Sequence, residues 1–399
     1  MPQSRSLRRT NPITVVLAGL LIIGFLIFIF SSPGDATTSS APSGKKQRSK
    51  NAASNILSPP SLPFRKSKQP LAQQPPPPVV HYHLNNITTS SDPIKNRETV
   101  LILTPLARFC PEYFDNLLKL TFPHELISVG FIIPKDSAGN AATKQLQEQI
   151  AKTQAGSESK RFASITILRQ DFEPPFQSQA EGDRHRIEKQ KIRRAAMAKA
   201  RNSLLFTTLG PTTSWVLWLD SDIVETPPSL IQDLALHDKP IIVPNCYQKF
   251  FNKEKNQLDV RPYDYNSWID SDAAKELASH MGNDEILLEG YSEMATYRML
   301  MAFMYDEGPI DQLDPHKEVQ LDGVGGTALL VKADVHRDGA MFPPFAFYHL
   351  IETEGFAKMA SRLGWKSWGL PNYFVSTAVI DKRRNCVVAD MSQVYHFNE

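Results

Sequence analysis

Two aspartates one residue apart, Asp220 and Asp222, are the residues of this sequence best suited to chemistry. They follow the apolar run Trp215–Leu219, which indicates a buried strand, and precede a Thr-Pro-Pro segment typical of a helix start. On an extended chain, residues two apart project to the same side, with Cα atoms about 6–7 Å apart. Two carboxylates placed in this way suit a divalent cation such as Mg²⁺ or Mn²⁺ that also holds phosphates. The alternative is that the pair only forms a turn or caps the next helix.

A basic segment precedes the aspartates. A basic helix is usually a solvated face, and this explains most of its members. Arg201 is different, because it lies next to an apolar stripe and one connection before the aspartate strand. An arginine there could make two-pronged contacts with phosphate oxygens and stabilise a departing diphosphate. The basic residues of the segment are Arg184, Arg186, Lys189, Lys191, Arg193, Arg194, Lys199 and Arg201.

Beyond Cys246 the sequence becomes richer in aromatic and acidic residues. Aromatic faces and carboxylate or amide hydrogen bonds hold sugars, so this region suits a carbohydrate site, although an ordinary core with polar loops is the alternative for each single residue. The segment 322–326 (DGVGG) allows a close backbone approach or makes a tight turn. The acids Glu352 and Glu354 start an expected helix, where they also complement the helix dipole. The best candidates for sugar contacts are Tyr263, Asp264, Asn266, Trp268, Glu289 and Tyr291.

Length and composition set the frame for these residues. The 399 residues suffice for one large domain or two, plus tails. Charge is nearly balanced, with 44 Lys and Arg against 42 Asp and Glu, so no global field points to nucleic acid. The three cysteines lack Cys-x-x-Cys spacing and allow at most one disulfide, which excludes a dense disulfide framework and gives no zinc motif.

The N-terminal part predicts a membrane anchor. An uncharged apolar run, Ile13–Phe30, follows a basic start and is 18 residues long, close to the length needed to cross a bilayer as a helix. A cleaved signal peptide is the competing interpretation, but signal cores are shorter and the following residues imitate a cleavage site only weakly. With residues 1–12 in the cytosol, the rest is expected to be lumenal, as in a type II membrane protein of the secretory pathway.

Residues 31–96 are rich in Pro, Ser, Gln and Lys and predict a disordered lumenal stem. The sequence Asn86-Ile87-Thr88 is a glycosylation acceptor pattern that fits a lumenal location. Residues 97–399 are expected to form the catalytic domain. There, apolar runs alternate with segments of helical character, which predicts an α/β domain with a mainly parallel sheet flanked by helices. The apolar runs are residues 100–103, 127–133, 165–168 and 215–219, and the helical segments are about residues 111–120, 141–155 and 182–209. Ligands of such sheets bind beyond the carboxyl ends of the strands, where the two aspartates emerge.

Several long segments resemble one family. WVLWLDSDIVETPPSLIQDL, RPYDYNSW, EGYSEMATYR, LDGVGGTALLVKADVHRDGAMFP and HLIETEGFAKMA look like the fungal Golgi mannosyltransferases of the mannan polymerase complexes. These enzymes extend the α-1,6-linked backbone of N-glycan outer chains. The match spans roughly residues 96–373, and so many blocks in order are far more specific than one D-x-D motif.

The resemblance implies an A-type glycosyltransferase fold, a GDP-mannose donor, Mn²⁺, a Golgi location and assembly with related subunits. It implies retaining transfer of mannose to the 6-hydroxyl of an α-mannoside. Asp220 and Asp222 would bind the metal, and Arg201 would assist departure of GDP. The alternatives are a scaffold subunit with little or no activity and a mannose-binding protein without turnover. Candidates for donor or acceptor contacts are Asp220, Asp264, Glu289, Asp322 and Glu354.

The C-terminal tail departs from the family. Members end soon after a motif like GLPNYxVYH, whose histidine completes the metal site, whereas here GLPNYFV runs on into STAVIDKRRNCVVADMSQ before VYHFNE. Deleting residues 375–393 restores the pattern, and their codons can contain fungal donor, branch and acceptor sites. The hypothesis is a translated intron, which makes His396 the third metal ligand. In the chain as it stands, Thr377 takes the histidine's position.

Overall fold

The computed structural model describes residues 79–171, 187–252, 256–291, 294–309 and 312–377. All of them belong to one compact unit that spans Pro59–Glu399. The expected cytosolic tail, the expected anchor at Ile13–Phe30, most of the stem and most of the segment 375–393 lie outside the described residues. Within the ranges just given, no helix is both long enough and apolar enough to cross a membrane. Asn86 is described and exposed, at the end of a short 3-10 helix, Leu84–Asn86.

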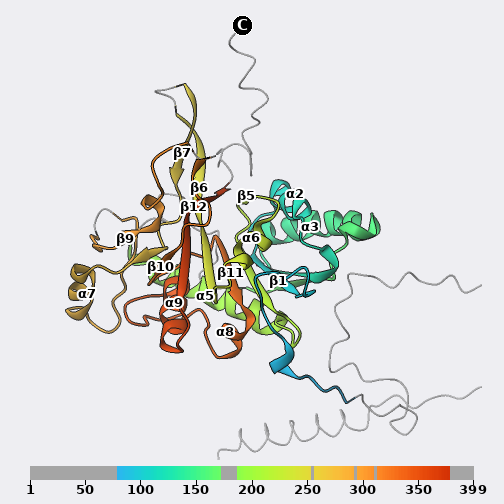
Figure 1. Cartoon of the computed structure of the whole chain (residues 1–399), viewed down its shortest axis with the longest axis horizontal. Coiled ribbons are helices and arrows are strands. Elements are labelled where there is room, and N and C mark those ends of the chain that lie inside the picture. Colours follow the sequence, from blue (N-terminus) through green and yellow to red (C-terminus); the bar gives the residue numbers. More distant parts are fainter. Residues whose placement is uncertain (1–78, 172–186, 253–255, 292–293, 310–311, 378–399) are drawn as a thin grey trace, which may run out of the picture. The chain divides into compact units, whose positions relative to one another are not determined.

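A ten-stranded sheet forms the centre of the described domain (Figure 1). Eight of its strands follow one another in a continuous order, and two more pair with them at the side. Of these two, β5 (Ile223–Glu225) pairs with β12, and β7 (Gln257–Pro262) pairs with β6. A separate two-stranded sheet is formed by β8 (Trp268–Ile269) and β9 (Met299–Leu300). The order along the main sheet is β10 (Val319–Leu321), β12 (Ser367–Thr377), β6 (Ile241–Asn252), β11 (Ala328–Lys332), β4 (Trp215–Leu219), β1 (Val100–Pro105), β2 (Ile127–Ile133) and β3 (Ser164–Arg169).

Strand direction corrects the expectation of a mainly parallel sheet. The half formed by β3, β2, β1 and β4 is parallel, as predicted. Strand β11, however, runs antiparallel to both β4 and β6, and β10, β5 and β7 also pair antiparallel. The sheet is therefore mixed. An apolar run predicts a buried strand but carries no information about its direction, which depends on the path of the connections.

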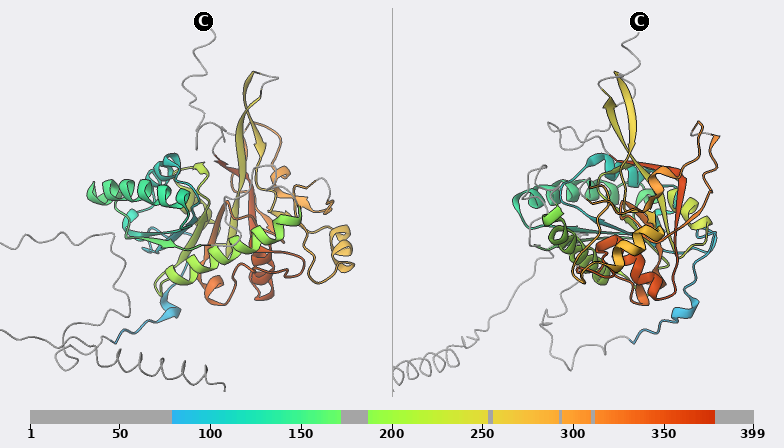
Figure 2. Two further views of the ribbon diagram at one scale, coloured as in Figure 1. Left: turned by 180° about the vertical axis from the view of Figure 1, so that it is seen from behind. Right: turned by 90° about the vertical axis from the view of Figure 1, so that its left-hand side faces the viewer.

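Helices cover both faces of the sheet (Figure 2). On one face pack α2 (Pro111–Lys119), α3 (Ser137–Ala155) and α6 (Leu230–Leu236). On the other face pack α5 (Ile187–Thr208), α8 (Ala333–Arg337) and α9 (Glu352–Arg362). The domain also contains α7 (Asp272–Ser279) and the 3-10 helices η3 (His124–Leu126), η4 (Glu158–Lys160) and η5 (Met301–Phe303).

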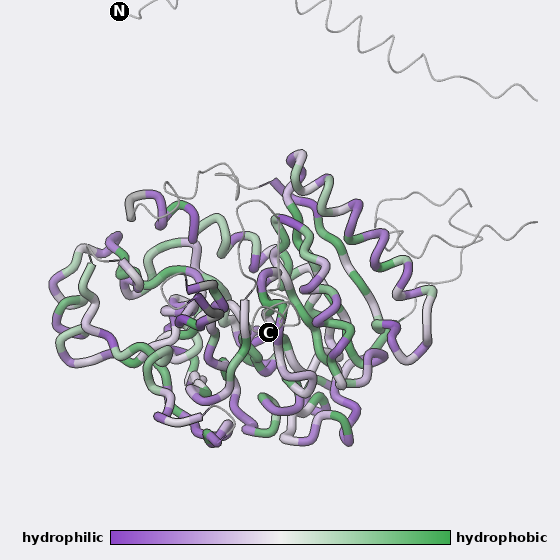
Figure 3. Tube along the Cα trace, turned by 90° about the horizontal axis from the view of Figure 1, so that it is seen from above, coloured by the Kyte–Doolittle hydropathy of each residue, from purple (hydrophilic) through white to green (hydrophobic). Residues whose placement is uncertain are grey.

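The central strands are apolar at every position because both of their faces are covered. Along β4, Trp215, Leu217 and Leu219 pack on the α2–α3–α6 side, whereas Val216 and Trp218 pack on the α5–α9 side. All five residues are fully buried. Figure 3 shows the same arrangement as hydrophobic strands inside a more hydrophilic periphery. The strand that carries the two aspartates is therefore held rigidly from both sides.

A buried histidine supports β4 from the α8 side. The indole N–H of Trp218 donates to Nε2 of His336 over 3.3 Å, and the His336 Nδ1–H donates to the carbonyl of Ala340 over 2.8 Å. The ring is therefore a neutral imidazole with both nitrogens satisfied. Burial lowers the pKa of His336 to about 4, although the bond to Ala340 opposes the shift.

We expect this histidine to destabilise the domain in acid. Between pH 6.5 and 4 the unfolded chain binds a proton at His336 that the folded chain excludes, so this contribution to stability is complete above pH 6.5 and is lost as the pH falls. The loss approaches about 3 kcal/mol near pH 4. Denaturant unfolding at several pH values should show a flatter profile for His336→Gln than for the unsubstituted chain. The exposed His280→Gln is the control and should follow the parent; an unchanged profile for His336→Gln would contradict the prediction.

Candidate active site

Asp220 and Asp222 lie in the turn that joins β4 to β5. The backbone N–H of Asp220 donates to the Thr327 carbonyl over 2.9 Å, and the N–H of Ile223 donates to the Asp220 carbonyl over 3.1 Å. The pair therefore emerges at the carboxyl end of β4, as predicted, but sits on a turn rather than on extended chain. Because that turn is anchored to the residue preceding β11, the two carboxylates have fixed positions.

Arg201 connects Asp220 to the start of α9. Its Nη2 lies 2.9 Å from Oδ1 of Asp220, and its Nε lies 3.2 Å from Oε1 of Glu352. The Arg201 side chain is only 4% exposed, so both ion pairs are strongly screened from water. Burial raises the pKa of Asp220 to about 6, Arg201 opposes that shift, and the nearby Asp222 and Glu352 carboxylates add to it. A fixed cation and a carboxylate of elevated pKa thus share one edge of the turn.

Asp222 has one oxygen in use and one available. Its Oδ2 accepts a hydrogen bond from the hydroxyl of Tyr263 over 2.7 Å. Its Oδ1 is buried and has no hydrogen-bond partner among the described residues. Burial raises the pKa of Asp222, while the Tyr263 bond lowers it. An unsatisfied buried carboxylate oxygen is costly, so Oδ1 is available to a metal ion, a water molecule or a ligand group.

A cavity of about 620 Å³ opens beside Arg201 and Asp220. It lies between α5, the β6–β7 hairpin, the loop before β11 and the start of α9. Basic, acidic and aromatic side chains all contribute to its wall, a combination that suits a ligand with phosphate and sugar groups. The basic residues are Arg193, Arg194, Arg201, Lys249 and Arg261; the acidic ones are Asp220, Asp264, Glu289 and Glu352; the aromatic ones are Phe250, Tyr263, Tyr265 and Tyr291.

Asp264 is fixed against a glycine loop. Its carboxylate accepts from the Asn266 backbone N–H over 2.8 Å and from the Thr327 hydroxyl over 3.1 Å. A Cβ on Gly325 would lie 1.6 Å from Oδ2 of Asp264, and one on Gly326 would lie 2.8 Å from Nη2 of Arg201. Gly325 and Gly326 therefore let Asp264 and Arg201 pack directly against the backbone of this loop. Of the two roles that the sequence allowed, close approach and a tight turn, the structure shows the first. Burial raises the pKa of Asp264.

Glu289 faces the cavity and is held from behind. Its carboxylate accepts from the Thr296 hydroxyl over 2.7 Å and pairs with Nη1 of Arg298 over 2.8 Å. Arg298 also pairs with Asp270 over 3.2 Å and stacks 3.6 Å above the ring of Trp268. This buried network fixes the cavity wall on the side away from β4.

A family model described as Anp1 matches residues 78–346 of the chain. The chain belongs to the Anp1 family. The resemblance drawn from the sequence blocks is thus confirmed for the family. Among relatives, the mannan polymerase complex subunit MNN9 of Candida albicans is 56% identical over 294 residues, covering 74% of this chain and 78% of its own. The mnn9 subunit of Schizosaccharomyces pombe is 57% identical over 294 residues, covering 74% and 84%.

A further relative of this Anp1 family chain is the ANP1 subunit of mannan polymerase II from Saccharomyces cerevisiae, 36% identical over 297 residues, with 74% of this chain and 58% of that protein covered. Among solved structures, a Pyrobaculum calidifontis mannosyltransferase in complex with GDP-Man and Mn²⁺ is 10% identical, covers 74% of this chain and 61% of its own, and has a TM-score of 0.37. A likeness at that TM-score gives no basis for an assignment.

The turn of this Anp1 family member fits a hard divalent cation in part. Asp222 offers an unpartnered buried oxygen, and the Asp220 side chain keeps 29% of its surface exposed. Within the described ranges, no group of three or more His, Cys, Asp or Glu residues could hold a metal ion. The expected third ligand, His396, lies outside those ranges. Thr377 of β12 pairs with Ile223, so position 377 lies on the strand beside the aspartate turn.

Trp268, a candidate for a sugar contact, is fully buried and does not line the cavity. Two further expected contact residues also lie away from the cavity. Asp322 is exposed and accepts from the backbone N–H of Asp270 over 2.9 Å. Glu354 is completely buried beneath the wall, 3.4 Å from the indole nitrogen of Trp268 and 3.8 Å from Arg194. Burial raises its pKa to about 7, and the Arg194 and Arg298 cations oppose that shift. Direct contact of either residue with a substrate stays a prediction, one that these positions do not favour.

Sequence reasoning missed two members of the site. Glu352 holds Arg201, yet its place at the start of a helix suggested only a dipole role. It has a φ of +57°, a left-handed conformation rare outside glycine and often found at functional sites. Arg194, which donates to Asn266 over 2.9 Å, was assigned to a solvated face. The signal available for it was its spacing of seven residues from Arg201, which places both on one face of α5.

Proposed function

We propose that the chain is a retaining α-1,6-mannosyltransferase. It transfers mannose from GDP-mannose to an α-mannoside of N-glycan outer chains, as a subunit of a Golgi mannan polymerase complex. The observation that carries the proposal is the Asp220–Arg201 pair in the wall of a cavity rich in arginine and carboxylate. Asp222 does not line this cavity; it lies behind Tyr263, which does, and keeps one oxygen without a partner among the described residues. The names of the MNN9 and ANP1 relatives as mannan polymerase subunits support the acceptor class and the assembly with related subunits. The α/β sheet flanked by helices is compatible with the A-type glycosyltransferase fold.

In this proposal Asp222, helped by Asp220 and His396, would hold Mn²⁺. The ion would supply Lewis-acid stabilisation of the charge that develops on the departing diphosphate. Asp222 is prepared for this role because Tyr263 occupies only its Oδ2 and leaves Oδ1 available. The fixed Asp220 backbone keeps the second carboxylate at a constant distance from the first.

Arg201 is placed to stabilise the same leaving group directly. Its guanidinium is already held by Asp220 and Glu352, so it needs no reorganisation when negative charge appears nearby. The close packing of Gly326 against it excludes water from that side. Its Nη1, buried and without a partner among the described residues, is left to receive a phosphate oxygen.

The sugar would lie deeper in the cavity, where Asp264 and Glu289 present carboxylates to hydroxyl groups. Because donor and product are both α-linked, the reaction retains configuration. In a same-face reaction the leaving phosphate itself can accept the proton of the attacking hydroxyl, so the proposal assigns no separate base. We further propose a single-pass type II arrangement, with the catalytic domain in the Golgi lumen.

The direct test uses full-length protein purified in detergent, GDP-mannose, Mn²⁺ and a short α-1,6-mannoside. We expect release of GDP together with one added hexose, whose α-1,6 linkage is read by methylation analysis. If GDP-mannose binds but neither GDP nor a longer mannoside forms, alone or with the related subunits present, the transferase proposal fails.

The second candidate function is a scaffold subunit of the same complex, with little or no activity. The observation that favours it is Thr377 beside the aspartate turn, because a threonine hydroxyl replaces imidazole poorly as a metal ligand. We propose instead that residues 375–393 are a translated intron and that His396 takes that position after splicing. Sequencing cDNA across this junction decides between the two candidates: absence of the segment from the transcript supports the intron and the transferase, and its retention supports the scaffold subunit. A transcript that retains the segment in active protein would refute the intron.

A further inference from the structure

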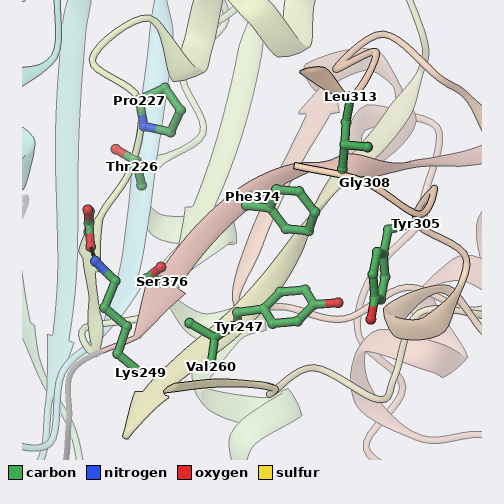
Figure 4. A pocket seen from close by; sticks show the side chains of 11 residues that line it. Thr226, Pro227, Tyr247, Lys249, Val260, Tyr305, Gly308, Leu313, Phe374 and Ser376 are labelled. Atoms are coloured by element: carbon green, nitrogen blue, oxygen red, sulfur yellow. Dashed lines mark hydrogen bonds and ion pairs between the residues drawn. The ribbon is translucent and has the colours of Figure 1, made fainter. Parts of the chain in front are cut away.

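A second pocket, of about 470 Å³, lies near the end of β12 (Figure 4). Three aromatic rings form its wall: Tyr247 from β6, Phe374 from β12 and Tyr305 from the loop after η5. Their centroids are 5.2 Å apart for Tyr247 and Phe374, 6.2 Å for Tyr247 and Tyr305, and 6.4 Å for Tyr305 and Phe374, all with nearly perpendicular planes. The rings support one another in this edge-to-face arrangement, so the wall is rigid.

The aromatic wall is prepared to receive a ligand. The Tyr247 hydroxyl donates to the Ala302 carbonyl over 2.8 Å, so its polar end is satisfied inside the protein and its ring remains for apolar contact. Tyr305 is 45% exposed and Val260, which also lines the pocket, is 48% exposed. Large apolar groups exposed together at a concave site mark a binding surface more often than isolated exposed residues do.

The other side of the pocket is polar. Lys249, which Figure 4 labels, lines the pocket. It pairs with Glu225, which lines the pocket as well. The Lys249 side chain is 24% exposed and that of Glu225 55%, so each keeps hydrogen-bonding capacity toward the pocket mouth. A pyranose has an apolar C–H face and a rim of hydroxyl groups. The aromatic wall can pack against the C–H face, and the ion pair opposite can hydrogen-bond to the hydroxyl groups. An aliphatic side chain of a partner protein, as the alternative ligand, would make no use of the ion pair.

Strand β6 places this pocket next to the 620 Å³ cavity beside Arg201 and Asp220, which the proposed function makes the catalytic cavity. Alternate side chains of a strand point to opposite faces. Accordingly, Tyr247 lines the aromatic pocket and Gln248 lines the catalytic cavity, while Lys249 reaches both. A polymer longer than the catalytic cavity can therefore continue around Lys249 into the second pocket.

We propose that the Tyr247–Tyr305–Phe374 pocket is a second carbohydrate site, which binds an α-mannoside unit of the acceptor or product chain away from the point of transfer. The inference rests on the proposed function, because it takes its ligand class from there. Such a site raises the effective concentration of long acceptors at the catalytic cavity without contacting the reacting atoms. It would favour extension of existing chains over short ones.

The test is equilibrium binding, which requires no turnover. Full-length protein in detergent is titrated with a linear α-1,6-mannohexaose and, separately, with methyl α-mannoside, by isothermal titration calorimetry. Tyr305→Ala should weaken binding of the hexasaccharide by roughly ten-fold, the loss typical of one aromatic anchor. Phe345→Ala, at an aromatic residue that is 50% exposed elsewhere, is the matched control and should bind as the parent does. Thermal melting confirms that both variants fold.

Each outcome has a distinct meaning. Equal hexasaccharide affinity of Tyr305→Ala and the parent overturns the second site. The same result together with loss of co-purifying related subunits overturns it in favour of a protein interface. If hexasaccharide binding depends on Tyr305 but no mannose is transferred, the carbohydrate site is supported and the transferase proposal fails. If mannose is transferred to short acceptors but binding does not depend on Tyr305, the transferase proposal is supported and the carbohydrate site fails.

Discussion

Replacing Asp222 by asparagine should lower the rate of GDP release in the transfer assay by about 10³-fold or more. The amide is nearly isosteric, so Tyr263 can still donate to its oxygen and the turn should keep its shape. What disappears is the negative charge of the Asp222 carboxylate, whose Oδ1 has no partner among the described residues. Metal-dependent binding of GDP, followed by calorimetry with and without Mn²⁺, should be lost together with the rate.

Asp233 offers a matched control for that experiment. Its Oδ2 accepts a tyrosine hydroxyl, that of Tyr373, over 2.7 Å, as Asp222 does from Tyr263. It lies on α6 and not on the β4–β5 turn that carries Asp220 and Asp222. Asp233→Asn should therefore change stability slightly and leave the rate intact. Unchanged activity of Asp222→Asn would remove the aspartates from the mechanism.

Replacing Arg201 should have the next largest effect. Arg201→Lys keeps the charge but carries its donors on a single nitrogen, so it cannot reproduce contacts made by the separate Nη2, Nε and Nη1 atoms of the planar guanidinium. The rate should fall by roughly 10²-fold. Arg201→Met also leaves the largely buried Glu352 and the partly exposed Asp220 without their cation, so it should reduce the rate further and destabilise the fold by about 3 kcal/mol. Rates and urea unfolding of the same preparations separate the two effects.

Arg337→Lys is the comparison for Arg201→Lys. Arg337 is less buried, with 17% of its side chain exposed against 4% for Arg201, but it is likewise paired, with Asp334 over 2.9 Å. It donates to the Thr213 carbonyl over 2.7 Å and lies outside the cavity. Equal loss of rate in the two lysine variants would mean that Arg201 acts only through stability. A rate loss confined to Arg201→Lys supports its role at the leaving group.

Local patterns predicted the elements well where burial alone decides them. The apolar runs became β1, β2, β3 and β4, and the segments of helical character became α2, α3 and α5. The position of the two aspartates at the carboxyl end of β4 followed from the same logic, but their conformation did not, because they lie on a turn and not on extended chain. Arg201 stood out from the basic segment because an apolar stripe accompanied it, and it is indeed buried.

Features that depend on distant segments were not accessible in this way. Glu352 became a site residue because α9 packs against α5, a contact that no local pattern near residue 352 encodes. The antiparallel direction of β11 follows from a long excursion through β6, β7, β8 and β9 before the chain returns beside β4. The sequence marked Gly325 as part of a segment for a tight turn or a close approach, but it did not show that the approaching group is the Asp264 carboxylate.

The Arg201–Glu352 ion pair joins residues 151 positions apart. On a ribosome the chain therefore presents Arg201 and Asp220 long before their partner exists. Until α9 has been synthesised, the arginine has one carboxylate instead of two and the cavity lacks a wall. Parallel pairings among β1, β2, β3 and β4 involve nearer segments and can form earlier, because closing a shorter loop costs less chain entropy. The half of the sheet formed by β1–β4 is thus expected to assemble first, and the cavity beside Arg201 closes only when α9 is in place.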